Sequence, residues 1–242
     1  MARSCAFCGK DKVTNEHVFA KWVRNEFRSK RGVAILDFEK DEKLAWSHGG
    51  KPLVHKVKFF CASCNNGWMS RLEVSAGKIL RPMLNAEHVG IKMGYADQLT
   101  VASWAVKTAM VCQHLHPSEN FIPESYYRDF YKRKQPSSNV YVLIGARHKA
   151  EHIFEYKERF IGYSQTVGIQ HVHFAIGALY LGMEMFIGRR RQYPSVMNDA
   201  AAERALQVWP VQPRDVIWPS ESINEVGGIE GMFAAFSSAI WS

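Results

Sequence analysis

From residue 61 the chain reads Cys61-Ala-Ser-Cys64-Asn65-Asn66-Gly67, and a second pair with the same spacing, Cys5-Ala-Phe-Cys8, lies near the N-terminus. Two thiolates separated by two residues chelate zinc from a single turn, and zinc prefers four such soft ligands in a tetrahedron. The 52 residues between the pairs are enough for a hairpin that returns the second pair to the first. We therefore predict one structural zinc ion held by all four cysteines, whose binding energy helps to fold a small domain.

The composition is that of an ordinary packed globule. The chain has 242 residues, of which 47% are hydrophobic and 22% are charged, which excludes intrinsic disorder and collagen-like or mucin-like repeats. No apolar run approaches the ~20 residues that span a bilayer, and the first residues lack the apolar core of a signal peptide. We expect a cytoplasmic protein without a membrane partner, in which cysteine pairs hold metal more often than they form disulfides.

The positive charge is concentrated in the part of the chain that contains the cysteine pairs. The formal net charge is +8, and residues 1–90 contain 16 Lys and Arg against 9 Asp and Glu. A basic segment joined to a nearly neutral one favours a polyanionic partner, and nucleic acid before a membrane surface. The alternative is that this charge serves solubility alone.

Residues 1–88 are expected to form a small zinc-bound domain. The apolar spacing predicts helices where it repeats every three or four residues and strands where it alternates. The predicted order is a strand at 13–19 interrupted at 15–17, a helix at 20–31, a loop or hairpin turn at 37–51, a strand at 53–60 and a helix at 65–80.

Residues 89–242 are expected to form a mixed α+β domain with an antiparallel sheet. β-branched and aromatic residues indicate its strands, and apolar stripes indicate its helices. The predicted elements are helices at 97–114, 124–134 and 229–241 and strands within 139–145, 153–163 and 171–187. No chemical motif stands out in this domain, so substrate selection, homodimerisation and binding of a regulatory protein all stay open as its role.

Three residues near the cysteines can carry chemistry. If zinc clamps the two pairs together, the helix that begins at Asn65 lies near the strand that contains Glu16 and His17. A carboxylate and an amide carbonyl are hard oxygen ligands of the kind that Mg²⁺ accepts, and a helix N-terminus attracts phosphate. Histidine is the side chain best suited to take a proton from water near neutral pH.

These residues together resemble the HNH endonucleases of the His-Me finger (ββα-metal) superfamily, in the treble-clef zinc branch with the endonuclease VII-type motif. The resemblance covers roughly residues 3–75 and implies a ββα-metal domain that hydrolyses phosphodiester bonds in nucleic acid, most simply DNA. It matches His17 to the general base, Glu16 and Asn65 to the ligands of a catalytic Mg²⁺ or Mn²⁺, and the four cysteines to a structural Zn²⁺ site. It also implies a nucleoid-associated protein, or one encoded by a phage or mobile element.

Two positions depart from the family pattern. The acidic metal ligand is Glu16 where Asp is more usual, and no asparagine lies between Asn25 and Asn65. That middle asparagine normally orients the histidine, and His48 is a candidate to replace it. The cations expected along the nucleic acid backbone are Lys10, Lys12, Lys56, Lys58 and Arg71. The alternative function is a non-catalytic zinc treble clef that binds nucleic acid or protein without cutting.

Overall fold

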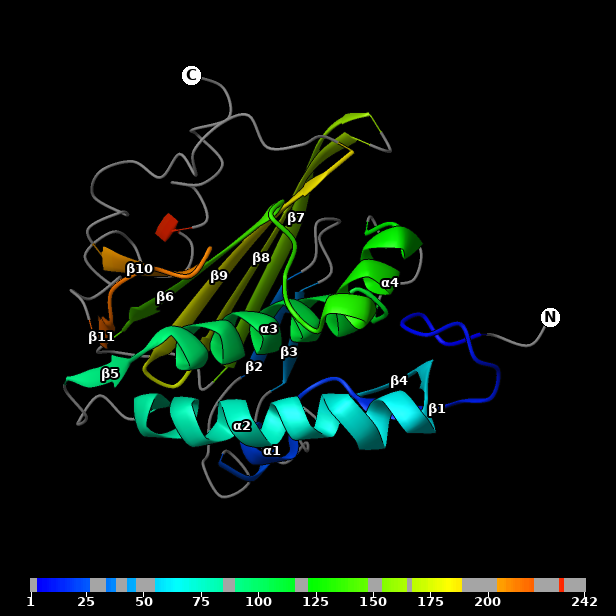
Figure 1. Cartoon of the computed structure of the whole chain (residues 1–242), viewed down its shortest axis with the longest axis horizontal. Helices are drawn as coiled ribbons and strands as arrows, with labels where there is room; N and C mark the ends of the chain where they lie inside the picture. The colour runs from blue at the N-terminus through cyan, green and yellow to red at the C-terminus, as the bar shows by residue number, and fades with distance from the viewer. Residues whose placement is uncertain are drawn as a thin grey trace.

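The computed structural model is a mixed α+β fold in which helices lie against antiparallel sheets (Figure 1). It describes residues 4–26, 34–37, 43–46, 55–84, 90–115, 122–147, 154–164, 167–188, 204–219 and 231–232. None of the described helices combines the length and the apolar character that crossing a membrane requires. The predicted division between residues 88 and 89 and nearly all of the helix predicted at 229–241 lie outside the described residues.

The N-terminal part contains a two-stranded antiparallel sheet, called the hairpin below, and a long helix that follows its second strand. Helix α1 (Lys21–Glu26) and strands β2 (Ala34–Asp37) and β3 (Lys43–Trp46) lie between the two strands in the chain. Strand β1 (Val13–His17) pairs antiparallel with β4 (Lys56–Cys61), and a bulge interrupts the register between Thr14 and Glu16. A wide helical turn, η1 (Cys64–Met69), kinks at Gly67 and continues into α2 (Ser70–Leu80). The predicted strand at 53–60 and the predicted helix at 65–80 are confirmed by β4 and α2. The strand predicted at 13–19 is shorter: β1 includes residues 15–17, which were expected to interrupt it, and ends at His17. The apolar stripe of the helix ends where it does because Pro82, in the turn η2 (Arg81–Leu84), cannot continue the backbone ladder.

Two further helices follow. The short helix α1 (Lys21–Glu26) lies after β1, within the predicted range 20–31. Helix α3 (Tyr95–Cys112) is buried at every residue from Val101 to Cys112, so it runs through the interior and not along the surface. Helix α4 (Glu124–Arg133) is amphipathic and buries Tyr127 and Phe130. The helices predicted at 97–114 and 124–134 are therefore confirmed.

In the described part of the chain, seven strands form the large sheet, in the order β10-β6-β9-β8-β7-β2-β3. Neighbours pair antiparallel except β2 and β7, which are parallel. The strands are β2 (Ala34–Asp37), β3 (Lys43–Trp46), β6 (Val140–Ala146), β7 (Phe154–Ser164), β8 (Val167–Ile176), β9 (Leu179–Ile187) and β10 (Ala205–Trp209). A small sheet pairs β5 (Ile91–Met93) with β11 (Val216–Trp218).

The structure corrects two sequence-based expectations. Residues 43–46, predicted to lie in a loop or hairpin turn, form β3, the last strand of the large sheet in the described part of the chain, because antiparallel pairing with β2 supplies their backbone hydrogen bonds. The strand expected over 171–187 is two strands joined by a tight turn at Gly177 and Ala178. Gly177 has a φ of 57°, and a Cβ there would lie 2.4 Å from the carbonyl oxygen of Leu84, so only glycine fits this turn.

Aromatic contacts join the hairpin, the helices and the large sheet into one apolar core among the described residues. Phe19, just after β1, packs against Phe154 of β7 with ring centroids 4.5 Å apart. Trp22 of α1 packs against Trp104 of α3 at 5.4 Å. Helix α3 contacts α2 on one side and the large sheet on the other, so the two halves of the chain meet along this helix (Figure 1).

Candidate functional site

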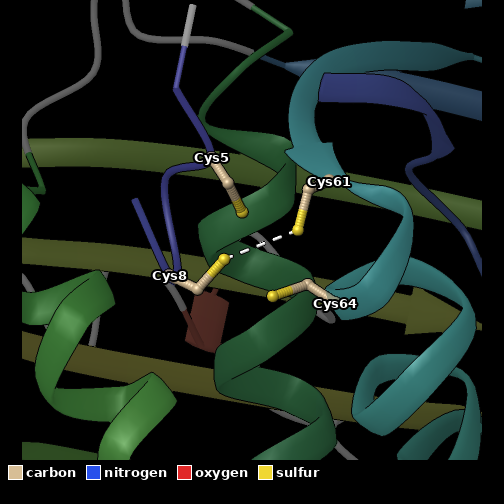
Figure 2. Close-up of side chains that lie close together, drawn as sticks. All are labelled: Cys5, Cys8, Cys61 and Cys64. Atoms are coloured by element: carbon tan, nitrogen blue, oxygen red, sulfur yellow. Dashed lines mark hydrogen bonds between the residues drawn. The ribbon is translucent and has the colours of Figure 1, made fainter. Parts of the chain in front are cut away.

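The four cysteines of the two predicted pairs come together. Their sulfur atoms all lie within 4.8 Å of one another, and Figure 2 shows the four side chains converging from the N-terminal loop, the end of β4 and the start of η1. The Sγ atoms of Cys8 and Cys61 are 3.5 Å apart. The edge of a zinc tetrathiolate tetrahedron is about 3.8 Å, since each Zn–S bond is about 2.3 Å. The prediction that these residues are positioned to bind a metal ion such as zinc is therefore confirmed.

Backbone hydrogen bonds shape the loop that carries the first pair. The Gly9 amide donates to the Cys5 carbonyl at 2.9 Å, and the Cys5 amide donates to the Lys10 carbonyl at 2.8 Å. Gly9 has a φ of 77°, which the tight turn requires and which side chains disfavour. The Ala6 amide donates to the Phe59 carbonyl at 2.9 Å and thereby attaches this loop to β4, the strand that ends in the second pair.

The thiols differ in how readily they ionise. Burial opposes ionisation of Cys61, but hydrogen bonds, first of all from Ser63 and the Cys64 backbone amide, outweigh it and lower the pKa of Cys61 to about 6. Burial raises the pKa of Cys64 above its ordinary range. The lowered pKa favours the thiolate form of Cys61 at neutral pH, and a bound divalent ion would favour thiolate ligands throughout the cluster.

Helix α4 covers the cysteine cluster. Phe7, between the first two cysteines, stacks on Phe60 with ring centroids 5.0 Å apart and lies 5.6 Å from the ring of Tyr127. The Arg128 side chain donates to the Cys5 carbonyl at 3.0 Å. The metal-binding loop is thus held by a helix that lies more than 100 residues further along the chain.

The structure brings Asn65 to the strand that contains Glu16 and His17. The Nδ2 atom of Asn65 donates to the carbonyl oxygen of Asn15 at 3.4 Å, so the start of η1 lies against the residue before Glu16. Side chains alternate along β1. Asn15 is exposed, Glu16 is 6% exposed and His17 is half-buried. Glu16 is therefore more deeply buried than its neighbours on the strand.

Four charged residues influence the ionisation of Glu16 and His17. Burial raises the pKa of Glu16 to about 7, Lys107 and Arg24 act to lower this pKa, and Glu73 acts to raise it. Burial lowers the pKa of His17, with further lowering by Arg24 and Lys56 and an opposing contribution from Glu73. His17 is therefore neutral at pH 7, and Glu16 is poised between its two protonation states.

Sequence reasoning missed Glu73 and Lys107. Glu73 lies on α2, and its Oε1 atom is 2.7 Å from the Nζ atom of Lys107 on α3. The Lys107 side chain is fully buried, and that of Glu73 is 18% exposed. The sequence did contain one signal: Lys107 lies in the middle of a helix among residues that are almost all apolar or small. A lysine buried in such a helix needs an acidic partner, because an unpaired ammonium is costly to bury.

The predicted backbone-binding cations are all on the surface. Strand β4 exposes two of them on one face, Lys56 and Lys58, on either side of the buried Val57. The exposed cations are Lys10, Lys12, Lys56, Lys58 and Arg71. His48, the candidate to orient His17, lies outside the described residues.

In comparisons with known proteins, no family model, no curated protein and no solved structure matches this chain.

Proposed function

We propose that this protein is a metal-dependent endonuclease of the HNH type that hydrolyses phosphodiester bonds in nucleic acid, most simply DNA. The observation that carries the proposal is the hydrogen bond from Asn65 to Asn15, because it joins the start of the helix to the strand that contains Glu16 and His17. The pairing of elements supports it as well, since it is compatible with a ββα-metal domain: β1 pairs antiparallel with β4, and β4 leads past Cys61 and Cys64 into η1 and α2.

His17 is the proposed general base. Its lowered pKa keeps the imidazole neutral at physiological pH, so that it can accept a proton from the attacking water. The negative charge of Glu73 favours the protonated form of His17 and would stabilise the imidazolium that results. Half-burial leaves the ring accessible to a substrate phosphate while holding it in place.

Glu16 and Asn65 are the proposed holders of a divalent cation. The Nδ2 atom of Asn65 donates to Asn15, so the side-chain oxygen of Asn65, Oδ1, is the atom proposed to face the cation. Carboxylate and amide oxygens are ligands that Mg²⁺ and Mn²⁺ accept. Such an ion supplies Lewis-acid stabilisation of the phosphate and the leaving 3′ oxygen. The zinc of the four cysteines has a structural role, since four thiolates fill its coordination sphere.

The exposed cations of β4 and α2 are the proposed contacts to nucleic acid. Lys56 and Lys58 present two ammonium groups on one face of the hairpin, and Arg71 lies one turn and a half after Asn65. Contacts of this kind position the phosphate backbone without reading the bases.

A zinc-stabilised binding module that does not cut is the second candidate. The observation that favours it is the burial of Glu16, which is only 6% exposed, whereas a metal ligand must reach its ion. In that case the four cysteines and the exposed lysines would keep their roles, and Glu16 would be a structural residue.

Incubation of supercoiled plasmid with the protein and Mg²⁺ or Mn²⁺ tests the proposal. We expect nicking or linearisation by the wild type, loss of cleavage in His17→Ala and Glu16→Gln, and retained cleavage in His55→Ala. His55 is a matched control, because it is also half-buried beside the hairpin and burial likewise lowers its pKa.

Zinc content and a binding assay without divalent ions complete the experiment. Equal cleavage by wild type and His17→Ala would remove His17 from the mechanism. Binding of nucleic acid without cleavage by any of the proteins would favour the binding module. Parallel reactions with single-stranded DNA and with RNA establish which nucleic acid is the substrate.

A further inference from the structure

One carbonyl oxygen joins the turn that carries the first two cysteines to helix α4. The Cys5 carbonyl accepts two hydrogen bonds, from the Gly9 amide at 2.9 Å and from Nη1 of Arg128 at 3.0 Å. A carbonyl oxygen has two lone pairs, so both are used here. The first bond closes the turn on itself, and the second attaches it to α4, a helix outside the stretch that resembles an HNH domain.

The Arg128 guanidinium lies directly over Gly9. A Cβ on Gly9 would be 2.8 Å from Nη1 and 3.3 Å from Cζ of Arg128, so the absence of a side chain at this position is what lets the guanidinium approach the turn. Nη2 of Arg128 forms an ion pair with Glu124, one turn earlier on α4, and the Arg128 side chain is only 28% exposed. The guanidinium is therefore held by its own helix through one nitrogen and bound to the cysteine turn through another.

Aromatic side chains fix α4 against the same turn. Phe7, between the two cysteines, is fully buried, and its ring lies 5.6 Å from that of Tyr127 and 5.0 Å from that of Trp68. The Tyr127 hydroxyl donates to the Met110 carbonyl of α3 at 3.0 Å, which ties this part of α4 to the interior of the molecule. Because Phe7 is enclosed in this way, the turn and its two sulfur atoms are positioned by α4 as well as by the hairpin.

We propose that Arg128 is a positioning residue of the metal centre, which holds residues 5–9 in the shape that binds zinc and so raises the affinity of the chain for the ion. Arg128 supplies no ligand atom. A turn that α4 already holds in place loses less conformational entropy when the metal binds than a free turn does. The guanidinium also offsets part of the negative charge that four thiolates leave around one Zn²⁺.

The coupling between zinc and α4 is reciprocal. If contact with α4 strengthens zinc binding, zinc stabilises the contact with α4 by the same free energy. The ion therefore joins α4 to the hairpin, two parts of the chain more than 60 residues apart. This role belongs to the metal centre and does not depend on the proposed nuclease activity.

The test measures the zinc dissociation constant of the full chain by competition with a chromophoric chelator. We expect Arg128→Met to bind zinc about tenfold or more weakly than wild type, as is usual when a residue that orients metal ligands is lost. Arg128→Lys should bind about threefold more weakly, because lysine keeps a positive donor but cannot hold Glu124 and the Cys5 carbonyl at once. Arg133→Met is the matched control, since Arg133 lies on the same helix and pairs with Asp129, four residues earlier, at 3.7 Å. It should bind zinc like wild type.

A second control separates metal affinity from general stability. Val172 is fully buried in β8 of the large sheet, so Val172→Ala lowers the unfolding temperature without altering the cysteine turn. We expect this variant to keep the zinc dissociation constant of wild type at a temperature where it is folded. Thermal unfolding and circular dichroism of the zinc-loaded proteins establish that each variant is folded during the titration.

A wild-type zinc dissociation constant in folded Arg128→Met would overturn the inference, and in Arg128→Lys it would do so if Arg128→Met does not fold. An equal loss of affinity in Arg128→Met and in either control would overturn it too, because the effect would then belong to helix ion pairs or to overall stability. Failure of the wild type to bind zinc would remove the metal centre and this inference with it. Absence of plasmid cleavage by a wild type that binds zinc would refute the proposed function alone and leave the role of Arg128 standing.

Discussion

Two groups of ionisable residues, one beside the hairpin and one inside the large sheet, both have shifted pKa values, yet of the two only the first includes a partly exposed side chain, that of His17. In the sheet, burial lowers the pKa of His171 to about 3 and raises that of Glu184 to about 8. Both side chains are therefore uncharged at pH 7, although their Nδ1 and Oε1 atoms are 3.6 Å apart. Beside the hairpin, the raised pKa of Glu16 results from burial that Lys107 and Arg24 oppose.

The difference follows from where the strands lie. Strand β8, which carries His171, has a paired neighbour on each side, and all its residues after the first are buried. In the described part of the chain, β1 pairs only with β4, so His17 stays half-exposed while Glu16 points inward. Burial by itself is enough to shift a pKa, as His171 and Glu184 show. A reactive site also requires access for a substrate, and the partly exposed His17 meets this requirement whereas the buried His171 does not.

Loss of the cysteine cluster is the largest effect we expect, and it would show how far the hairpin depends on metal. Cys61→Ser or Cys64→Ser removes a ligand, and the expected destabilisation is several kcal/mol, because metal binding and folding are coupled. Zinc analysis and thermal unfolding measure it. Cys112→Ala is the control, since Cys112 is buried on α3, outside the cluster, and costs little. Equal losses in all three variants would contradict a metal role.

Two histidine substitutions test the comparison directly. We expect His17→Ala to lose at least about 10²-fold in cleavage rate with little loss of stability, because a general base acts on the reaction. We expect His171→Ala to lose about 2 kcal/mol of stability and to cleave normally once folded, because His171 is entirely buried. Plasmid cleavage and denaturant unfolding give the two readings. Normal cleavage by His17→Ala or loss of cleavage by folded His171→Ala would reverse the assignment.

We expect the ionisation of Glu184 to contribute to the pH dependence of stability. Its pKa rises from an ordinary 4.5 to about 8 on folding, so between these values the folded state keeps a proton that the unfolded state releases. The contribution of Glu184 to the free energy of unfolding therefore falls as the pH rises through this window, by at most about 1.4 kcal/mol per pH unit. Glu184→Gln should flatten this slope in urea unfolding at a series of pH values, whereas Asp11→Asn, at an exposed position, should leave it unchanged. An unaltered slope in Glu184→Gln would show that the carboxyl ionises in place.

The surface lysines should have the smallest effect. Lys58→Ala is expected to weaken nucleic acid binding modestly and to reduce the slope of log affinity against log salt by about 0.9, because one phosphate contact is lost. Lys78→Ala is the matched control on the exposed side of α2. Fluorescence anisotropy over a salt series measures both. Identical slopes for the two variants would remove Lys58 from the interface.

Local spacing made part of this structure predictable. The two cysteine pairs could be recognised as metal ligands because two residues between thiols is a property of one turn, and the helix from residue 65 to 80 could be recognised from its apolar stripe. Strand β3 could not, because it joins the large sheet through β2, and β2 pairs with β7, which lies more than 100 residues further along the chain. Side-chain alternation alone does not specify which strands meet.

The candidate site divides in the same way. The sequence alone determined the metal-binding cysteine pairs and made Glu16, His17 and Asn65 candidates, because spacing within each pair and donor chemistry can be recognised locally. Only the tertiary structure decided that Glu16 is buried and that Lys107 pairs with Glu73. Burial and ion pairing depend on which distant elements pack together, and the chain around Lys107 contains no local signal that its partner lies 34 residues earlier on α2.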